Sequence, residues 1–414
     1  MKFQKFRNKD IYKEALLLHK DKVGKIDVIS KVKTENGHDL ALAYSPGVAQ
    51  PCREIAKNPA LLNTYTARGN MIAVVSDGSA VLGLGNIGAK ASLPVMEGKC
   101  VLFKQFGGVS AFPLCVDSQD NDQIVNLVKL LEPSFAGINL EDISAPRCFE
   151  IEERLKKETQ MLIFHDDQHG TAIVTLAGLF NALKIYGLDM GAIKIAMNGA
   201  GAAGHSIIKL LSKLGVKNIL VCDTKGIIYR GREGLNFAKV EIAGLTNPNN
   251  IKGSLIDAVD GADVFIGVSV ADQLKPEMVA KMRKKPIIFA LANPEPEIKV
   301  DLAMSIGIEI IATGRSDYPN QVNNVLAFPG VFRGALDANA KDINMDMKLA
   351  AAKALAAIVE KELRLDYIIP KPFDVRVLPS VATSVAAAAV ATGVAPADTD
   401  LDWIEYKAKN ILRK

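Results

Sequence analysis

Short apolar runs alternate with longer stretches of helical periodicity along most of this 414-residue chain. Apolar runs bounded by turn residues predict buried strands, and the amphipathic stretches between them predict helices. The predicted strands fall at 135–140, 160–164, 193–198, 217–222, 262–269, 285–293 and 307–314. This alternation is typical of an α/β fold. Residues 71–76 and 80–84 also read as strands, joined by a tight Asp77-Gly78 turn into a hairpin.

The chain ends carry helical patterns instead. Residues 8–20 have apolar side chains at helical spacing among charges, and 347–359 and 380–395 are rich in alanine. The stretch 380–395 is too short to span a membrane and its side chains are small, so we expect a tightly packed helix. A charged tail follows from 400 to 414.

Two glycine-rich turns contain the pattern G-x-G-x-x-G. The turn at 199–204 follows a predicted strand and opens an amphipathic helix, and the next strand ends at Asp223. The glycines would let the backbone approach a pyrophosphate, and Asp223 would bind a ribose hydroxyl. This context predicts a Rossmann-type dinucleotide site, against the alternative of a plain βαβ unit with glycines for packing. The turn at 83–88 lacks an acidic residue at the right distance and has Pro94 close behind, so we interpret it as unrelated to dinucleotide binding.

Two acidic pairs, Glu141-Asp142 and Asp166-Asp167, each follow a predicted strand. Open α/β sheets bind ligands at the carboxyl ends of their strands. Four carboxylates meeting there would repel one another unless a cation neutralised them, and hard oxygen ligands suit Mg²⁺ or Mn²⁺. Solvated strand ends with acidic helix starts are an equally good interpretation from the pairs alone.

Three further side chains are ambiguous by themselves. Lys99 lies in an apolar stretch, where it either reaches water or is buried as a base, and the first is favoured without other information. Tyr44, before the Pro46-Gly47 turn, is more typical of packing than of catalysis. His165 and His169 have a zinc-like spacing, but we expect Gly170 to start the helix after them, which disfavours zinc.

The composition excludes several classes of protein. A net charge of +4 is too small to indicate nucleic-acid binding, and no apolar run is long enough for a membrane span or a signal peptide. The five dispersed cysteines favour reduced thiols and a cytoplasmic setting. The composition therefore gives no indication of nucleic-acid or membrane partners.

Several separate motifs together resemble the malic enzyme family, in its short bacterial type. They are AYSPGVA (43–49), DGSAVLGLGNIG (77–88), VMEGK (95–99), INLEDISAP (138–146), FHDDQHGTA (164–172), LANPEPEI (291–298) and ATGRSDYPNQVNNVLAFPG (312–330). The resemblance covers nearly the whole chain. It implies oxidative decarboxylation of L-malate to pyruvate and CO₂, with NAD or NADP as the electron acceptor and Mg²⁺ or Mn²⁺ as the metal.

The resemblance also implies a role for individual residues. Tyr44 would be the general acid and Lys99 the general base, tuned by Asp166, and these three form the catalytic group. Glu141, Asp142 and Asp167 would bind the metal. Lys99, Asn293 and Asn324 would contact the substrate. The residues implied for the cofactor are Gly199, Ala200, Gly201, Ala202, Ala203, Gly204, Asp223 and Asn293.

The expected architecture is a Rossmann-type domain plus an α/β catalytic domain built from the N-terminal part and the C-terminal helices. We divide the chain into a substrate domain at 1–165, a dinucleotide-binding domain at 166–324 and a helical segment at 325–414 that packs back on the first. The N-terminal helix and the resemblance suggest a homodimer.

One departure from the family concerns the substrate carboxylate. Larger relatives carry an arginine after Asp-Gly-Glu, but here the run is Asp77-Gly78-Ser79-Ala80. Arg68 and Arg315 remain as candidates to bind the carboxylate. Lys225, Arg230 and Arg232 after Asp223 could neutralise a 2′-phosphate, so the cofactor preference also stays open, with dual use slightly favoured.

Three other functions fit parts of the pattern. They are a malolactic-type decarboxylase with bound NAD, another two-domain dehydrogenase, and a non-catalytic dinucleotide-binding sensor. The joint presence of Lys99, Tyr44 and the acidic pairs argues against the sensor.

Overall fold

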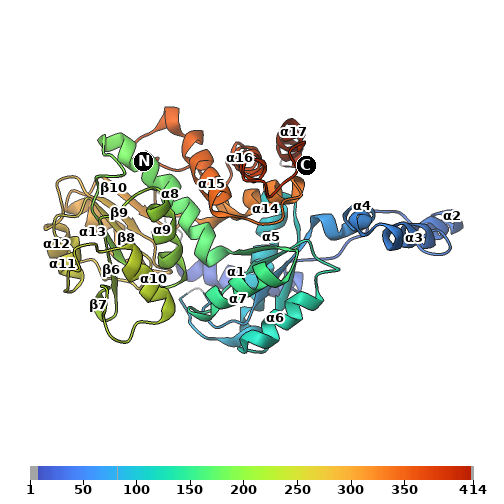
Figure 1. Cartoon of the computed structure of the whole chain (residues 1–414), viewed down its shortest axis with the longest axis horizontal. Coiled ribbons are helices and arrows are strands. Elements are labelled where there is room, and N and C mark those ends of the chain that lie inside the picture. Colours follow the sequence, from blue (N-terminus) through green and yellow to red (C-terminus); the bar gives the residue numbers. More distant parts are fainter. Residues whose placement is uncertain (1–7, 82, 412–414) are drawn as a thin grey trace.

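The computed structural model describes residues 8–81 and 83–411, and Figure 1 shows a two-part body with a slender arm at one end. The first part is a four-stranded parallel sheet in the order β2-β1-β3-β4. Its strands are β1 (Met71–Ser76), β2 (Ser110–Cys115), β3 (Gly137–Leu140) and β4 (Leu162–His165), and its helices are α5 (Gly88–Gly107), α6 (Asn121–Leu130) and α7 (Arg147–Glu158). The almost fully buried strands β1, β3 and β4 suit a parallel sheet covered by helices.

The second part is a six-stranded sheet in the order β10-β9-β8-β5-β6-β7, parallel except for the β6–β7 pair. Its strands are β5 (Ile195–Asn198), β6 (Ile219–Asp223), β7 (Gly226–Ile227), β8 (Val264–Gly267), β9 (Ile287–Ala290) and β10 (Ile310–Thr313). Its helices are α9 (Ala202–Lys213), α10 (Phe237–Leu245), α11 (Leu255–Val259), α12 (Pro276–Val279) and α13 (Val300–Ser305).

Helix α8 (Asp166–Tyr186) joins the two parts. One apolar core is continuous from Phe164 at the end of β4 through Ile173 of α8 to Met197 of β5. Because α8 is buried along most of its length, it fixes the end of the first sheet relative to α9, the helix that follows the glycine turn at 199–204.

The C-terminal helices return to the first part of the body (Figure 1). They are η3 (Asn324–Leu326), α14 (Phe328–Asp337), α15 (Met345–Ile358), η4 (Glu360–Glu362), α16 (Val377–Ala391) and α17 (Leu401–Ile411). A Cβ on Gly334 would lie 2.3 Å from the carbonyl oxygen of Ala382, so α14 and α16 pack backbone against backbone. Along 8–81 and 83–411, none of the helices combines the length and apolarity that crossing a membrane requires.

The N-terminal segment contacts the body near its two ends, where Lys25 bonds to Glu97 and Asn70 bonds to Gly108. Its elements are α1 (Asn8–Lys22), α2 (Gly37–Ala43), α3 (Ala49–Lys57), η1 (Pro59–Leu61), α4 (Leu62–Tyr65) and η2 (Ala67–Asn70). The arm formed by α2, α3 and α4 projects from the body (Figure 1), and none of these three helices has a buried residue. Leu40 and Leu42 on α2 are 55% and 65% exposed.

Two local predictions were wrong. Residues 71–76 do not form a hairpin with the described part of 80–84, in which residue 82 lies outside the described residues, because β1 pairs in parallel with β2 and β3. Gly83 and Gly85 have φ of 73° and 76°, which interrupts an extended strand and makes a compact loop before α5. Helix α8 starts at Asp166 rather than at Gly170, because two acidic side chains in its first turn complement the helix dipole.

Candidate active site

The acidic pairs meet where β3 and β4 end side by side. Glu141 and Asp142 directly follow β3, and Asp167 lies in the first turn of α8 after β4. One carboxylate oxygen from each of these three residues lies within 4.8 Å of the others. The backbone N–H of Asp142 donates to Asp167 Oδ2 at 2.7 Å. The structure therefore brings together the three residues expected to hold a metal.

Lys99 reaches this cluster from α5. Its side chain is buried, and Nζ lies 2.7 Å from Asp166 Oδ2 and 2.9 Å from Glu141 Oε1. Nζ also lies 4.5 Å from the centre of the Phe328 ring. Burial opposes the charge of this lysine, but the carboxylates of Asp166 and Glu141 outweigh it and raise the pKa of Lys99. Lys99 is thus a buried cation in the site.

The carboxylates outnumber this one lysine. Burial raises the pKa of Asp166 and of Asp167 to about 6, although Lys99 opposes the shift, and burial also raises the pKa of Glu141. Three carboxylates held close together at low dielectric need more positive charge than Lys99 supplies. An all-oxygen donor set of this kind fits Mg²⁺ or Mn²⁺.

Asp166 is held between Lys99 and the C-terminal part of the chain. The side-chain amide of Asn324 donates to the same Oδ2 that Lys99 contacts. A Cβ on Gly170 would lie 1.9 Å from Asp166 Oδ1. Asp166 precedes Gly170 by one helical turn of α8, so any side chain at position 170 would clash with its carboxylate. Asn324, expected at the substrate, is therefore placed directly beside the predicted base.

The dinucleotide turn has the predicted local structure. Gly199 follows β5 with φ of 119°, and a Cβ there would lie 2.7 Å from the carbonyl oxygen of Val268. A Cβ on Gly204 would lie 2.1 Å from the carbonyl oxygen of Gly199, so the strand and α9 pack without side chains between them. Ala202 begins α9, whose N-terminal N–H groups suit a pyrophosphate.

Asp223 ends β6 as predicted, but its carboxylate is already engaged. Oδ2 accepts hydrogen bonds from Arg232 and Lys239, and Oδ1 accepts one from the backbone of Lys225. Burial opposes the ionised form of this carboxyl, but the Arg232 and Lys239 hydrogen bonds lower its pKa to about 2. A permanently charged carboxylate beside two cations can accept from a ribose hydroxyl, and the cations can also face a phosphate.

Asn293 connects the two parts of the body. It follows β9, and a Cβ on Gly83 would lie 2.4 Å from its carbonyl oxygen. Gly83 thus permits close approach of the two chain segments, whereas a Cβ on Gly85 or Gly88 would meet nothing within 4 Å. Arg315 lies beside this turn, with Nη1 3.4 Å from the Pro294 carbonyl oxygen and ion pairs to Glu295 and Asp317.

The other candidate for the substrate carboxylate lies elsewhere. Arg68 belongs to η2 at the base of the arm, where it donates to the carbonyl of Glu132 at 3.0 Å and to the Asn63 side chain at 2.6 Å. Ser79, which directly precedes the position of the absent family arginine, is also engaged locally, since its hydroxyl donates to Asp77 at 2.6 Å.

Tyr44 is the one predicted catalytic residue that the single chain leaves away from the cluster. It follows α2 on the projecting arm (Figure 1) and is 70% exposed, whereas Lys99 is buried.

The sequence interpretation missed several supporting residues. Asn139 donates to Glu141 Oε2 at 2.7 Å from inside β3, and Phe328 lies under Lys99. A polar residue in an otherwise apolar strand was a usable signal for Asn139, whereas nothing local marks Phe328. His169 contacts Glu152 at 2.7 Å instead of pairing with His165 around a metal.

A buried lysine among carboxylates, in a chain that also contains a Rossmann dinucleotide turn, suits the oxidation of a small hydroxy acid with a divalent cation. The protein thus falls among two-part, dinucleotide-dependent dehydrogenases. Comparisons with known proteins are more specific. The model of the malic enzyme N-terminal domain matches residues 23–125 and 118–156, and that of the malic enzyme NAD-binding domain matches 168–393. The chain belongs to the malic enzyme family.

Individual relatives agree. The bifunctional malic/malolactic enzyme of Bacillus subtilis is 59% identical over 400 residues, covering 96% of this chain and 98% of that protein. The NADP-dependent malic enzyme of Salmonella typhimurium is 49% identical over 407 residues, covering 94% of this chain and 53% of that longer protein. The malic enzyme structure from Pyrococcus horikoshii is 46% identical with a TM-score of 0.93, covering 97% of this chain and 96% of that one.

These matches confirm the predicted family, the α/β fold with a Rossmann-like domain, and the enzyme class of NAD(P)-dependent decarboxylating malate dehydrogenases. They leave the roles of single residues, the domain boundaries and the oligomeric state as predictions.

Proposed function

We propose that this protein oxidises and decarboxylates L-malate to pyruvate at the cluster of Lys99, Glu141, Asp142, Asp166 and Asp167, as an enzyme of the cytoplasm. The observation that carries the proposal is the position of the buried Lys99 amine. Its nitrogen lies 2.7 Å from a carboxylate oxygen of Asp166 and 2.9 Å from one of Glu141. Proton transfer from a hydroxyl group needs an acid–base group in a fixed position, and these two contacts fix the Lys99 amine.

Glu141, Asp142 and Asp167 would hold Mg²⁺ or Mn²⁺, which when bound would stabilise the negative charge that develops on the substrate oxygen during decarboxylation. Carboxylates neutralised by a cation raise the pKa of Lys99 less than free carboxylates do. Lys99 could then accept the proton of the malate C2 hydroxyl. Asp166, fixed by Asn324, orients the Lys99 amine for this transfer.

Asn293, at the junction of the two parts, and Asn324 would bind the substrate. Of the two arginine candidates, Arg315 is favoured over Arg68 for the malate carboxylate because it contacts the turn that carries Asn293. The turn from Gly199 to Gly204 would bind the dinucleotide pyrophosphate, with nicotinamide as the hydride acceptor.

We assign the final protonation at C3 to Tyr44 of a second copy of the chain. The arm places Tyr44 outside its own body, and its helices leave apolar side chains exposed that a partner would cover. This arrangement makes the homodimer, predicted from the N-terminal segment, the catalytic unit.

The ion pairs of Asp223 favour use of both cofactors. Arg232 and Lys239 would offset the repulsion between Asp223 and a 2′-phosphate, so NADP would bind as well as NAD. We also propose domain limits of 1–165, 166–324 and 325–414. They are supported by the position of α8, which follows the last strand of the first sheet and precedes the first strand of the second.

The first assay measures absorbance of reduced cofactor with L-malate and Mn²⁺, using NAD and NADP separately, each with and without EDTA. The proposal predicts a chelator-sensitive rise with both cofactors and pyruvate as product. Purified folded protein that produces neither reduced cofactor nor pyruvate would contradict it.

A malolactic reaction is the second candidate, favoured by the bifunctional malic/malolactic name of the 59% identical relative from Bacillus subtilis. Lactate formed from malate with catalytic NAD, without net reduction of the cofactor, would identify that activity in the same assay.

A further inference from the structure

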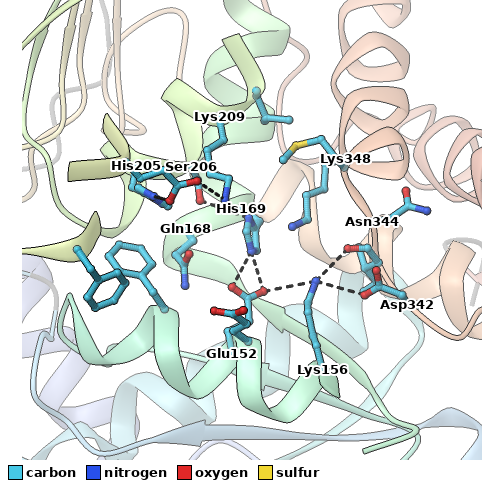
Figure 2. A pocket seen from close by; sticks show the side chains of 17 residues that line it. Glu152, Lys156, Gln168, His169, His205, Ser206, Lys209, Asp342, Asn344 and Lys348 are labelled. Carbon is cyan, nitrogen blue, oxygen red and sulfur yellow. Dashed lines mark hydrogen bonds and ion pairs between the residues drawn. The ribbon is translucent and has the colours of Figure 1, made fainter. Parts of the chain in front are cut away.

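A cavity of about 400 Å³ lies beside α8, and none of the residues of the acidic cluster lines it. Helices α7, α8, α9 and α10 and the start of α15 line it, so it is bounded by both parts of the body (Figure 2). Asp166 and Asp167 of α8 belong to the acidic cluster, whereas the next two residues, Gln168 and His169, line the cavity. The proposed catalytic residues do not line this cavity.

Most charged side chains of this cavity are already paired with one another. Of its four acids, Glu152, Glu241 and Asp342 each have a basic partner in the lining, and the fourth, Glu153, pairs with Lys157 outside it. The pairs are Glu152–His169 at 2.7 Å, Lys156–Asp342 at 3.2 Å, His205–Glu241 at 2.6 Å and Lys209–Glu241 at 2.9 Å. These contacts leave little unbalanced charge on α7, α8, α9 and α10.

Lys348 is different. It comes from the second turn of α15 and points into the space between His169 and Lys156 (Figure 2). It is only 5% exposed. Among the residues that the structure describes, its amine has neither a hydrogen bond nor an ion pair. Burial and the neighbouring Lys156 lower the pKa of Lys348 to about 7. A buried amine that lacks a partner costs stability, so its presence needs an explanation.

A second donor in the same lining also lacks a partner. The side-chain nitrogen of Gln168, a residue that is 2% exposed, is buried without a hydrogen bond. Leu210, Ile343 and Met345 add apolar surface to the cavity. Unsatisfied donors beside apolar side chains, in a cavity of this size, are typical of a binding site for a small anion with an apolar body.

We propose that this cavity binds a small monocarboxylate, whose carboxylate pairs with Lys348 and whose apolar part contacts Leu210, Ile343 and Met345. The amine of Lys348 and the side-chain nitrogen of Gln168 are two donors without hydrogen-bond partners among the described residues, and one carboxylate group has two oxygens to accept from them. A phosphate dianion would bring a second charge towards Glu152 and Asp342, which already have their partners. Because helices from both sheets line the cavity, the bound acid stabilises one arrangement of the acidic cluster relative to the dinucleotide turn.

The test is calorimetric titration of the intact protein with benzoate, an aromatic monocarboxylate, in the absence of malate and cofactor. Benzamide serves as the neutral analogue and inorganic phosphate as the dianion. Wild type should bind benzoate more tightly than either of the others. Lys348→Met should weaken benzoate binding at least tenfold, which corresponds to about 1.4 kcal/mol, since a charge-assisted contact is lost.

Lys209→Met is the matched control, because Lys209 lines the same cavity but is paired with Glu241 and is partly exposed. It should keep the wild-type affinity for benzoate. Lys348→Gln provides a second neutral variant should the methionine variant fold poorly.

Equal benzoate affinity in wild type and in both Lys348 variants would overturn the proposal. Two other results would also overturn it: tighter binding of phosphate than of benzoate, and no benzoate binding to folded wild type. Since titration needs no turnover, this result is independent of whether the protein oxidises malate.

Discussion

Lys99 is the residue on which the proposed chemistry depends most. We expect Lys99→Ala to lower kcat by roughly 10²–10⁴-fold, because it removes the proton acceptor. Manganese and dinucleotide should still bind, since other residues would hold them. Lys104→Ala, also on α5 but bonded only to Ser110 at 3.3 Å, is the control and should keep wild-type turnover. A near-normal kcat for Lys99→Ala would refute the assignment of the base.

Asp167 tests the metal site separately from the base. Asp167→Ala should raise the Mn²⁺ concentration needed for half-maximal activity by roughly tenfold or more, because it removes one oxygen ligand of three. Direct titration of Mn²⁺, followed by electron paramagnetic resonance, measures the affinity without turnover. Asp122→Ala is the control, because Asp122 is exposed and paired with Arg154. An unchanged Mn²⁺ titration would remove Asp167 from the ligand set.

Lys348 makes a prediction about stability and pH. Its pKa is about 7 in the folded protein against an ordinary 10.5, so the unfolded chain holds more protons between those values. Its contribution to the free energy of unfolding therefore rises with pH from 7 to 10.5, with about 1.4 kcal/mol for each unit of pKa difference. Lys156, Glu152, Asp342 and Lys209 carry the charges that act on it.

Lys348→Met removes this titration. The variant should therefore be more stable than wild type at pH 6, and the difference should shrink by pH 9. Melting temperatures of both proteins at the two pH values check this, and a constant difference would show that Lys348 keeps its ordinary pKa.

At the scale of single residues, the acidic pairs were predictable because strand ends are visible in the sequence and parallel strands place them at one edge. The surroundings of Asp166 were not. Asn324 is 158 positions away from Asp166 along the chain. Gly170 was interpreted as the start of a helix, whereas its missing side chain leaves room for the Asp166 carboxylate. Contacts between distant segments leave no local pattern.

The first turn of α8 gives a prediction at the scale of an element. A Cβ on Gly170 would lie 1.9 Å from Asp166 Oδ1, so Gly170→Ala must displace the carboxylate from Lys99. We expect a marked fall in kcat together with correct folding, because alanine is the better helix former. Circular dichroism checks the fold and the malate assay checks turnover.

Gly244→Ala is the matched control for this substitution. Gly244 lies inside α10, and a Cβ there would meet nothing within 4 Å. The control should keep its activity and gain up to about 1 kcal/mol of stability. Equal activity of the two variants would show that the position of Asp166 is unimportant.

The elements themselves were largely predictable. The strands that end in Asn198, Gly267, Ala290 and Thr313 lie within the apolar runs that predicted them, and the strand that ends in Asp223 extends one residue beyond its run, since buried parallel strands are continuous in hydrophobicity. The hairpin failed for a physical reason. The run at 80–84 is apolar, but Gly83 has a positive φ and lies against the backbone of Asn293. Asn293 belongs to the other part of the body, so this contact leaves no local pattern in the sequence.

At the scale of the whole molecule, the sequence suggested a partner for the N-terminal segment but gave no sign that Tyr44 would be separated from Lys99. The arm explains both observations. Helices without buried residues are not stable as isolated elements, so the arm requires a surface to pack on. A second copy of the chain could supply it and receive Tyr44 in exchange.

This exchange is tested by mixing two inactive proteins. Tyr44→Phe and Lys99→Ala should each be nearly inactive as homodimers. In a heterodimer, the Lys99→Ala chain would supply an intact Tyr44 to the site of the other chain, which retains Lys99, so one site in two is complete. Random exchange of subunits should therefore restore about a quarter of wild-type activity.

If Tyr44 acted within its own chain, every site in the mixture would lack one group and activity would stay at the level of the separate variants. A protein that is active while monomeric by light scattering would also refute the exchange. The control mixes Lys99→Ala with Asp167→Ala. Both substitutions lie in the body, where Lys99 and Asp167 belong to the same cluster. Each of the two sites in a heterodimer would therefore lack one of these side chains, and no recovery is expected.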